Sequence, residues 1–112
     1  MKRIAVPINE DGILDQHFGH CKYFAIIDIE DHQIGSQEIV QPPAHEPGLL
    51  PKWLADKGVT DVLAGGIGNR AIQNFNQHNI NVIAGAPELP SQELVAGFIN
   101  NSITFSSNCC DH

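Results

Sequence analysis

The chain has few basic residues, and that shortage excludes two classes of protein. Only six Lys and Arg are present against thirteen Asp and Glu, which gives a formal charge of −7 over 112 residues. A protein that binds duplex nucleic acid without sequence preference, or an anionic membrane surface, needs clustered Lys and Arg. The one adjacent basic pair is Lys2-Arg3. We therefore expect neither nucleic acid nor a membrane among the partners of this protein.

Long apolar runs and a disulfide framework are also missing. No apolar stretch approaches the roughly 20 residues of a membrane-spanning helix. Segment 1–7 begins like a signal peptide, but Pro7 and the polar segment 9–11 cut the apolar stretch short, so we expect a cytoplasmic protein. Three cysteines, two of them adjacent, do not form a set of disulfides. Cysteine is therefore expected to serve as a metal ligand, a reactive thiol or a small buried residue.

The remaining pattern predicts one α/β domain over residues 1–100, followed by a polar tail with Cys and His at 101–112. Three apolar strand patterns precede a Pro-rich loop, and helix and strand patterns alternate after it. This order predicts a mixed five-stranded sheet covered by helices, in which the strands lie in the order 3-2-1-4-5 when numbered along the chain. The expected strands are 4–8, 23–29, 33–40, 61–64 and 81–84, and the expected helices begin at residues 49, 69 and 91.

Right-handed crossovers would bring the carboxyl ends of the first, fourth and fifth strands to one edge of the sheet. Open α/β sheets bind their ligands at this edge. The loops 9–22 and 41–48 and the turns 65–68 and 85–90 should meet there. His17, His20, Cys21 and His45 are expected at this edge, and His32 and His78 at the opposite one.

Several of these residues are candidate metal ligands. His17, His20 and Cys21 offer two imidazoles and a thiol within five residues, which suits borderline or soft metals such as iron, copper or zinc. His45 lies in a Pro-rich loop, and Cys109, Cys110 and His112 form a second donor group at the C-terminus. The alternatives are a locally packed or capping histidine, a buried Cys21, a surface His45 and a frayed terminus.

The turn Gly65-Gly66-Ile67-Gly68 precedes a predicted helix, for which Asn69 is the expected cap. Backbone N–H groups and the helix dipole at such a start favour a bound anion. The alternative is that close packing of helix on sheet requires these glycines. The turn matches neither the dinucleotide-binding glycine pattern nor a phosphate-binding P-loop.

Catalytic patterns are weak. No serine lies in a nucleophile elbow, and no pair of carboxylates is placed for acid–base work. Nuclease chemistry of the ribonuclease-H type needs several carboxylates at strand ends, and Ile4, Val6 and Ile8 leave the first strand without one. We therefore predict that the protein is not an enzyme.

Taken in order, these segments resemble the dinitrogenase iron–molybdenum cofactor biosynthesis family, the small domain shared by carriers of the nitrogenase cofactor and its precursors. The resemblance spans Met1 to about Ile99. It is carried by these segments: Ile4-Ala5-Val6-Pro7, His17-Phe18-Gly19, Tyr23-Phe24, Pro43-Ala44-His45-Glu46-Pro47-Gly48, Trp53-Leu54 and Ala64-Gly65-Gly66-Ile67-Gly68.

The resemblance implies a three-layer, ribonuclease-H-like fold that binds an anionic metal–sulfur cluster rather than performing catalysis. It implies cofactor contacts at His17, Gly19, His45, Gly65, Gly66 and Gly68. The cluster would be of the iron–molybdenum or molybdenum–copper sulfide type, and cluster-assembly or acceptor proteins would be the partners. Many members have Arg-Ala where this chain has His20-Cys21, which removes an anion contact and adds metal donors.

A second interpretation needs no cluster. The segment from His17 to Cys21, or the C-terminal donors, would bind a single zinc, copper or iron ion in a simple metal-binding or redox-sensing module. Such a protein would carry metal without sulfide and would lack a cluster chromophore.

Overall fold

The computed structural model describes residues 2–15, 22–31, 33–42, 49–100 and 107–108. The predicted order of elements is confirmed, with boundaries that move by one or two residues and one added strand. The elements are β1 (Lys2–Ile8), β2 (Tyr23–Glu30), β3 (Gln33–Val40), α1 (Leu49–Asp56), β4 (Asp61–Leu63), α2 (Asn69–Gln77), β5 (Asn81–Ala84), α3 (Ser91–Asn100) and β6 (Ser107–Asn108).

The strands form one mixed sheet in the order β3-β2-β1-β4-β5-β6. β1 pairs antiparallel with β2 and parallel with β4, and β5 continues the parallel part. The predicted order of the first five strands is therefore confirmed. β6 adds a short strand within the segment 101–112, where Ser107 pairs with Ala84 and Asn108 with Ile83.

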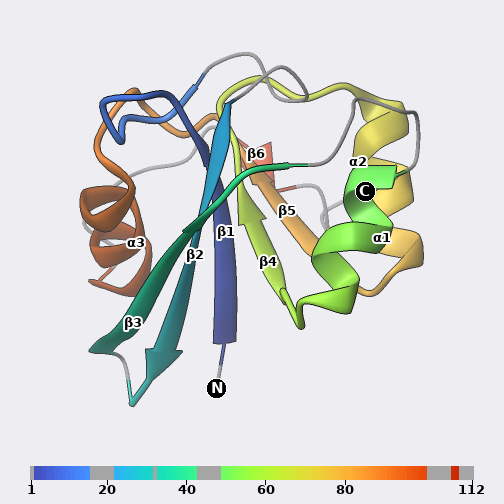
Figure 1. The fold of residues 1–112 in the computed structure, drawn as a ribbon. Helices are drawn as coiled ribbons and strands as arrows, with labels where there is room; N and C mark the ends of the chain where they lie inside the picture. The colour runs from blue at the N-terminus through green and yellow to red at the C-terminus, as the bar shows by residue number, and fades with distance from the viewer. Residues whose placement is uncertain (1, 16–21, 32, 43–48, 101–106, 109–112) are drawn as a thin grey trace.

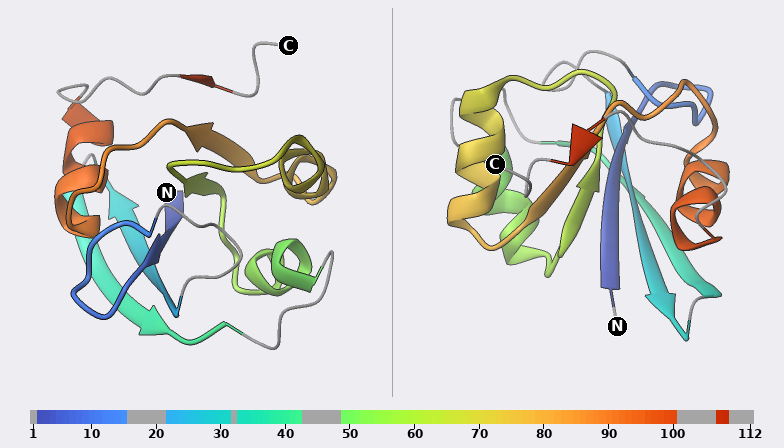
Figure 2. Two further views of the ribbon diagram at one scale, coloured as in Figure 1. Left: turned by 90° about the horizontal axis from the view of Figure 1, so that it is seen from above. Right: turned by 180° about the vertical axis from the view of Figure 1, so that it is seen from behind.

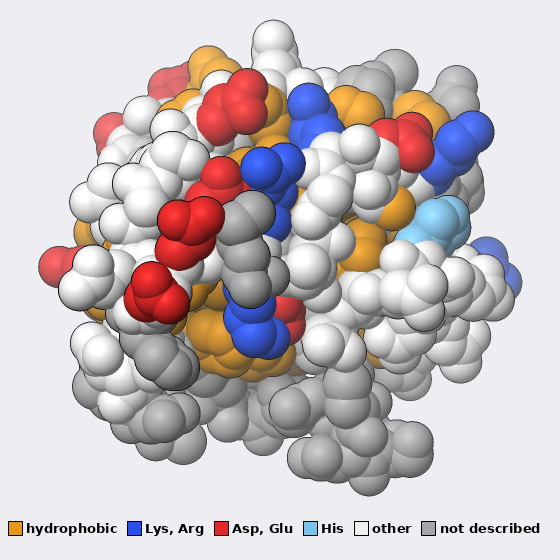
Figure 3. Space-filling model, turned by 90° about the horizontal axis from the view of Figure 1, so that it is seen from below, with side chains coloured by type: hydrophobic (Ala, Val, Ile, Leu, Met, Phe, Trp, Pro, Cys, Tyr) orange, Lys and Arg blue, Asp and Glu red, His pale blue; other side chains and the backbone are white. Residues whose placement is uncertain are grey.

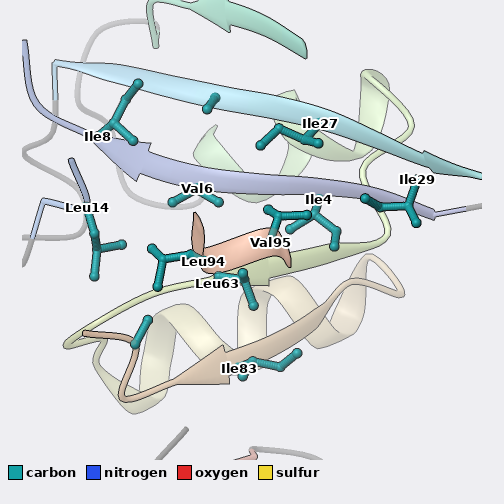
Figure 4. Packing of buried hydrophobic residues seen from close by; sticks show 12 residues of the cluster. Ile4, Val6, Ile8, Leu14, Ile27, Ile29, Leu63, Ile83, Leu94 and Val95 are labelled. Atoms are coloured by element: carbon teal, nitrogen blue, oxygen red, sulfur yellow. The ribbon is translucent and has the colours of Figure 1, made fainter. Parts of the chain in front are cut away.

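The sheet lies between two helical layers, with α3 on one face and α1 and α2 on the other (Figures 1 and 2). Alternation along β1 assigns its residues to these two faces, since successive strand side chains point to opposite sides. Ile4, Val6 and Ile8 pack in the cluster beneath α3 with Leu94 and Val95 (Figure 4). The second cluster, under α1 and α2, includes Ala5, Phe24, Leu54, Val62 and Phe75.

Two helix ends follow the predicted chemistry. Gly58 after α1 has φ +81° and Asn79 after α2 has φ +63°, so each takes the left-handed conformation that ends a helix. The start of α2 differs from the prediction. Gly68, not Asn69, is the capping residue, and no side chain of the part that the structure describes caps this helix end.

Ion pairs and hydrogen bonds tie the lower end of the sheet together. Arg3 donates from Nε and Nη2 to the carboxylate of Asp28, and from Nη1 to the carbonyl of Lys57 just beyond α1. Asp61, which is nearly fully buried, accepts hydrogen bonds from Thr60 and Lys2. Basic and acidic side chains are intermixed over this lower face (Figure 3). Among the described residues, this face therefore presents no broad area of one charge.

Candidate functional site: the carboxyl-end edge of the sheet

The chain segments after β1, β4 and β5 meet at the top of the molecule as drawn, which is the carboxyl-end edge (Figure 1). The described part of this edge consists of residues 9–15, the turn 64–68 with the first turn of α2, and the turn 85–90. The predicted meeting of these segments at one edge is thus confirmed for the part of the chain that the structure describes.

Segment 9–15 is held firmly against the turn that precedes α3. The Asn9 side chain closes its first turn by accepting the N–H groups of Asp11 and Ile13 at 2.8 and 3.2 Å. Leu14 N then donates to the carbonyl of Leu89 at 3.0 Å, and Leu14 itself is buried. The described segment therefore remains fixed by hydrogen bonds as far as Asp15, whose N–H donates to the carbonyl of Pro7.

An open depression of about 280 Å³ lies at this segment, lined by Asn9, Glu10, Asp11, Asp15 and Lys22. Lys22 forms an exposed ion pair with Glu10. The hydrogen bond and the positive charge of Lys22 lower the pKa of Glu10, and Glu10 in turn raises the pKa of Lys22. Three carboxylates against one ammonium leave this side of the edge acidic.

The other side of the edge is the glycine turn at the start of α2. Gly68 has φ −78° and ψ 156°, an extended conformation that any residue can adopt. A Cβ atom at this position would meet nothing within 4 Å. Among the described residues, close packing therefore does not explain Gly68, and none of them fills the space in front of the helix start.

Residues around Gly68 determine the hydrogen bonding and the charge at the start of α2. Gly65 accepts a hydrogen bond from Gly85 N at 2.9 Å, which joins the turns after β4 and β5. The N–H groups of the first helical turn have no partner within an α-helix, and no side chain in the described ranges caps them here. Arg70, exposed in this first turn, adds a positive charge. Sequence reasoning overlooked Arg70, although its position two residues after Gly68 was a readable signal.

The structure places only part of the predicted site. Gly65, Gly66 and Gly68 lie at the expected edge, Gly65 half-buried and the other two exposed. His78 lies at the opposite edge, as predicted, where its Nδ1 is 2.9 Å from the carbonyl oxygen of Asn74. The following predicted residues lie outside the described residues: His17, Gly19, His20, Cys21, His32, His45, Cys109, Cys110 and His112.

Two further observations concern the described residues alone. Within these ranges, no three His, Cys, Asp or Glu side chains come together in an arrangement that could hold a metal ion. None of the helices in these ranges is long and apolar enough to cross a membrane.

The tail strand β6 runs beside β5, with Ser107 opposite Ala84 at the carboxyl end of that strand. Because β6 is antiparallel to β5, the chain runs away from the candidate edge between Ser107 and Asn108.

Comparison with known proteins identifies the family. A family model described as dinitrogenase iron–molybdenum cofactor matches residues 1–101. The chain belongs to this dinitrogenase iron–molybdenum cofactor family. It is 34% identical over 87 residues to the protein MJ0580 of Methanocaldococcus jannaschii, an alignment that covers 73% of each chain.

Solved structures share the fold of this chain. The crystal structure of PH0822 matches with a TM-score of 0.84 and 32% identity, over 93% of this chain and 96% of that one. The apo form of the orange protein from Desulfovibrio gigas matches with a TM-score of 0.78 and 24% identity, over 96% and 95% of the two chains. At that identity, the likeness to the orange protein shows the shared fold. The predicted fold class is therefore confirmed.

Proposed function

We propose that this family member is a non-catalytic binder or carrier of an anionic metal–sulfur cluster, held at the carboxyl-end edge of the sheet. The observation that carries the proposal is the start of α2, where, among the residues that the structure describes, no side chain caps the first N–H groups and none fills the space before them. Such a helix start stabilises an anion through its N–H groups and dipole. The name of the family to which the chain belongs refers to the iron–molybdenum cofactor of dinitrogenase.

Charge favours one side of the edge for the cargo. Glu10, Asp11 and Asp15 make the depression beside β1 unfavourable for an anion, whereas Arg70 and the α2 dipole attract one. The net charge of −7 repels an anionic cluster at long range, but solvent and salt screen that repulsion beyond about 10 Å. We therefore assign the cluster to the side of the edge formed by the glycine turn.

The metal ligands remain those expected from the sequence. His17, with His20 or Cys21, would bind an edge metal of the cluster, and His45 would close over the opposite side. Cys109, Cys110 and His112 follow β6, which begins beside the carboxyl end of β5 and runs away from this edge, so their contribution is proposed from the sequence alone. A carrier has to release its cargo, so a small number of ligands suits the role.

The cluster type in this proposal is iron–molybdenum or molybdenum–copper sulfide. The protein would carry the cluster in the cytoplasm, where cluster-assembly proteins would supply it and acceptor proteins would receive it. None of these steps requires the protein to make or break a covalent bond in an organic substrate.

Anaerobic isolation of the native protein tests the proposal. Metals, acid-labile sulfide and the visible spectrum are measured on the same sample, and an empty sample is then incubated with a preformed iron–molybdenum cluster. Molybdenum or iron together with sulfide supports the cluster carrier. Zinc or copper without sulfide favours the simple metal module. A protein that stays colourless even after incubation contradicts both the carrier role and the proposed site.

A further inference from the structure

Strand β3 forms one end of the sheet and is exposed along nearly its whole length. In the part of the chain that the structure describes, β3 pairs only with β2. Its residues 33–39 are all exposed. Among the described residues, the two large hydrophobic residues that are exposed both lie in β3: Ile34, with 36% of its surface accessible, and Ile39, with 49%. Sheet edges in monomeric proteins usually carry charges that discourage pairing. Here eight residues contain a single charge, Glu38.

An irregularity in β3 places the two isoleucines on the same face. Ile39 pairs with Ala25 and Ile34 with Ile29, and both partners belong to the cluster beneath α3. Ile39 lies five positions after Ile34, so a regular strand would point the two side chains to opposite faces. The register shift opposite segment 27–29 adds one residue to β3 and removes this conflict.

The neighbours of the irregularity confirm the assignment of faces. Gln37 pairs with Ile27, on the α3 face, and its side-chain oxygen accepts a hydrogen bond from Gln92 of α3 at 2.6 Å. Ser36 lies on the opposite face, where its hydroxyl donates to Asp28 at 3.0 Å. The exposed edge therefore presents Ile34, Gln37 and Ile39 as one stripe.

We propose that β3 is a dimerisation edge that pairs antiparallel with β3 of a second copy of this chain. In a two-fold arrangement centred on Gln37, the Gln37 side chains of the two copies lie opposite each other. Once the extra residue in β3 is counted, Ile34 of each copy then lies opposite Ile39 of the other. The stripe is thus complementary to itself, as a two-fold interface requires.

The same register avoids a charge conflict. Glu38 of one copy lies opposite the irregular pair Gly35-Ser36 of the other, and not opposite a second Glu38. Directly opposed like charges destabilise a strand pair, whereas opposed β-branched side chains stabilise it. A second copy therefore fits this edge better than an arbitrary strand, which would have to match two isoleucines and a central amide by chance.

Sedimentation velocity over a range of protein concentrations, up to about 0.5 mM because small interfaces are weak, tests the proposal. The wild-type chain is expected to shift from monomer to dimer as concentration rises. Ile39→Lys should remain monomeric, because it opposes a charge to Ile34 of the second copy. Gln73→Lys, an equally charged change at an exposed position of α2, should dimerise like wild type. A wild-type protein that is monomeric throughout, or a dimer that survives Ile39→Lys, overturns the proposal.

Disulfide trapping tests the register itself. In Gln37→Cys, the new thiols of the two copies would be direct neighbours across the strand pair, where opposite Cβ atoms are about 5 Å apart. In the control Gln33→Cys, the new thiols would lie at opposite ends of the paired strands. Mild oxidation should give a peptide disulfide-linked through position 37 of both copies, identified by mass spectrometry, and none through position 33. Equal linkage at the two positions contradicts this register.

Discussion

Arg3 and Asp28 join three elements of the fold through one guanidinium group. Arg3 Nε lies 2.6 Å from Asp28 Oδ1 across the β1–β2 pair, and Nη1 of the same side chain donates to the carbonyl of Lys57 just beyond α1. The Asp28 carboxylate also accepts the hydroxyl of Ser36 from β3. A charged group with several fixed partners stabilises a structure more than an isolated surface ion pair does.

Replacing Arg3 should therefore destabilise the fold. Arg3→Met keeps much of the apolar stem but removes every donor, and we expect the melting temperature to fall by about 5 °C. Thermal unfolding followed by circular dichroism measures this. Lys22→Met is the matched control, because its ion pair with Glu10 is exposed on both sides. A larger loss in Lys22→Met than in Arg3→Met would contradict this ranking.

The free energy of unfolding should also depend on pH through the ionisation of Asp28. The hydrogen bond from Arg3 lowers the pKa of Asp28, which outweighs the opposite effect of burial. Its stabilising effect is therefore complete above the unfolded pKa of about 3.9 and is lost as pH falls through the lower folded value. Denaturant unfolding should show Asp28→Asn less stable than wild type at pH 6. The gap between the two proteins should shrink below about pH 4, and a constant gap would exclude this cause.

Phe75 anchors α2 on the sheet and is fully buried in the cluster beneath α1 and α2. Phe75→Ala should lower the free energy of unfolding by about 3–5 kcal/mol, since it removes a large core side chain and leaves a cavity. Urea unfolding measures the change. Gln73→Ala, exposed on the same helix, should change stability by less than about 0.5 kcal/mol. Comparable losses in the two variants would mean that α2 does not depend on this packing.

Substitutions at Gly68 should affect the stability of the empty protein and its binding of the cluster in different ways. Gly68→Ser should raise the stability of the empty protein by a few tenths of a kcal/mol, because the backbone is extended, the space is open and a hydroxyl can cap α2. Gly68→Asp should also be tolerated, but its carboxylate would compete with an anionic cluster at the helix start. Chemical unfolding and cluster retention are measured on the same samples.

Asn76→Asp is the charge-matched control for this test, because Asn76 is exposed near the other end of α2. It should retain the cluster as wild type does, while Gly68→Asp loses most of it. Equal retention in Gly68→Asp and Asn76→Asp would move the cargo away from the start of α2.

The sheet could be predicted because its determinants are local. Alternation of strand and helix patterns after residue 48 specifies parallel strands and right-handed crossovers, and the order follows from these rules. Gly58 and Asn79 marked their helix ends because only a few residue types accept a positive φ at low cost. The edge that holds the glycine turn followed from the same topology.

Other features depend on contacts between distant segments and left no readable pattern. The irregularity in β3 is defined by its register against β2, and β6 by a pairing of residues 107–108 with β5. The acidic depression needs Lys22 to approach Glu10 and Asp15. The prediction that Asn69 caps α2 was wrong. Gly68 occupies the N-cap position although it has no side chain to accept a hydrogen bond, whereas Asn, Asp and Ser are usually preferred there.

The most direct test of a cluster at the carboxyl-end edge compares two histidine variants. Empty His17→Ala and His78→Ala proteins are incubated anaerobically with the same preformed iron–molybdenum cluster, and molybdenum, iron and sulfide per chain are measured after desalting. Loss of a ligand should weaken cluster binding at least about tenfold in His17→Ala, since even indirect partners of ligands have effects of that size. His78→Ala, at the opposite edge, should retain the wild-type amount. Equal retention by both variants, or a loss confined to His78→Ala, would contradict the proposed site.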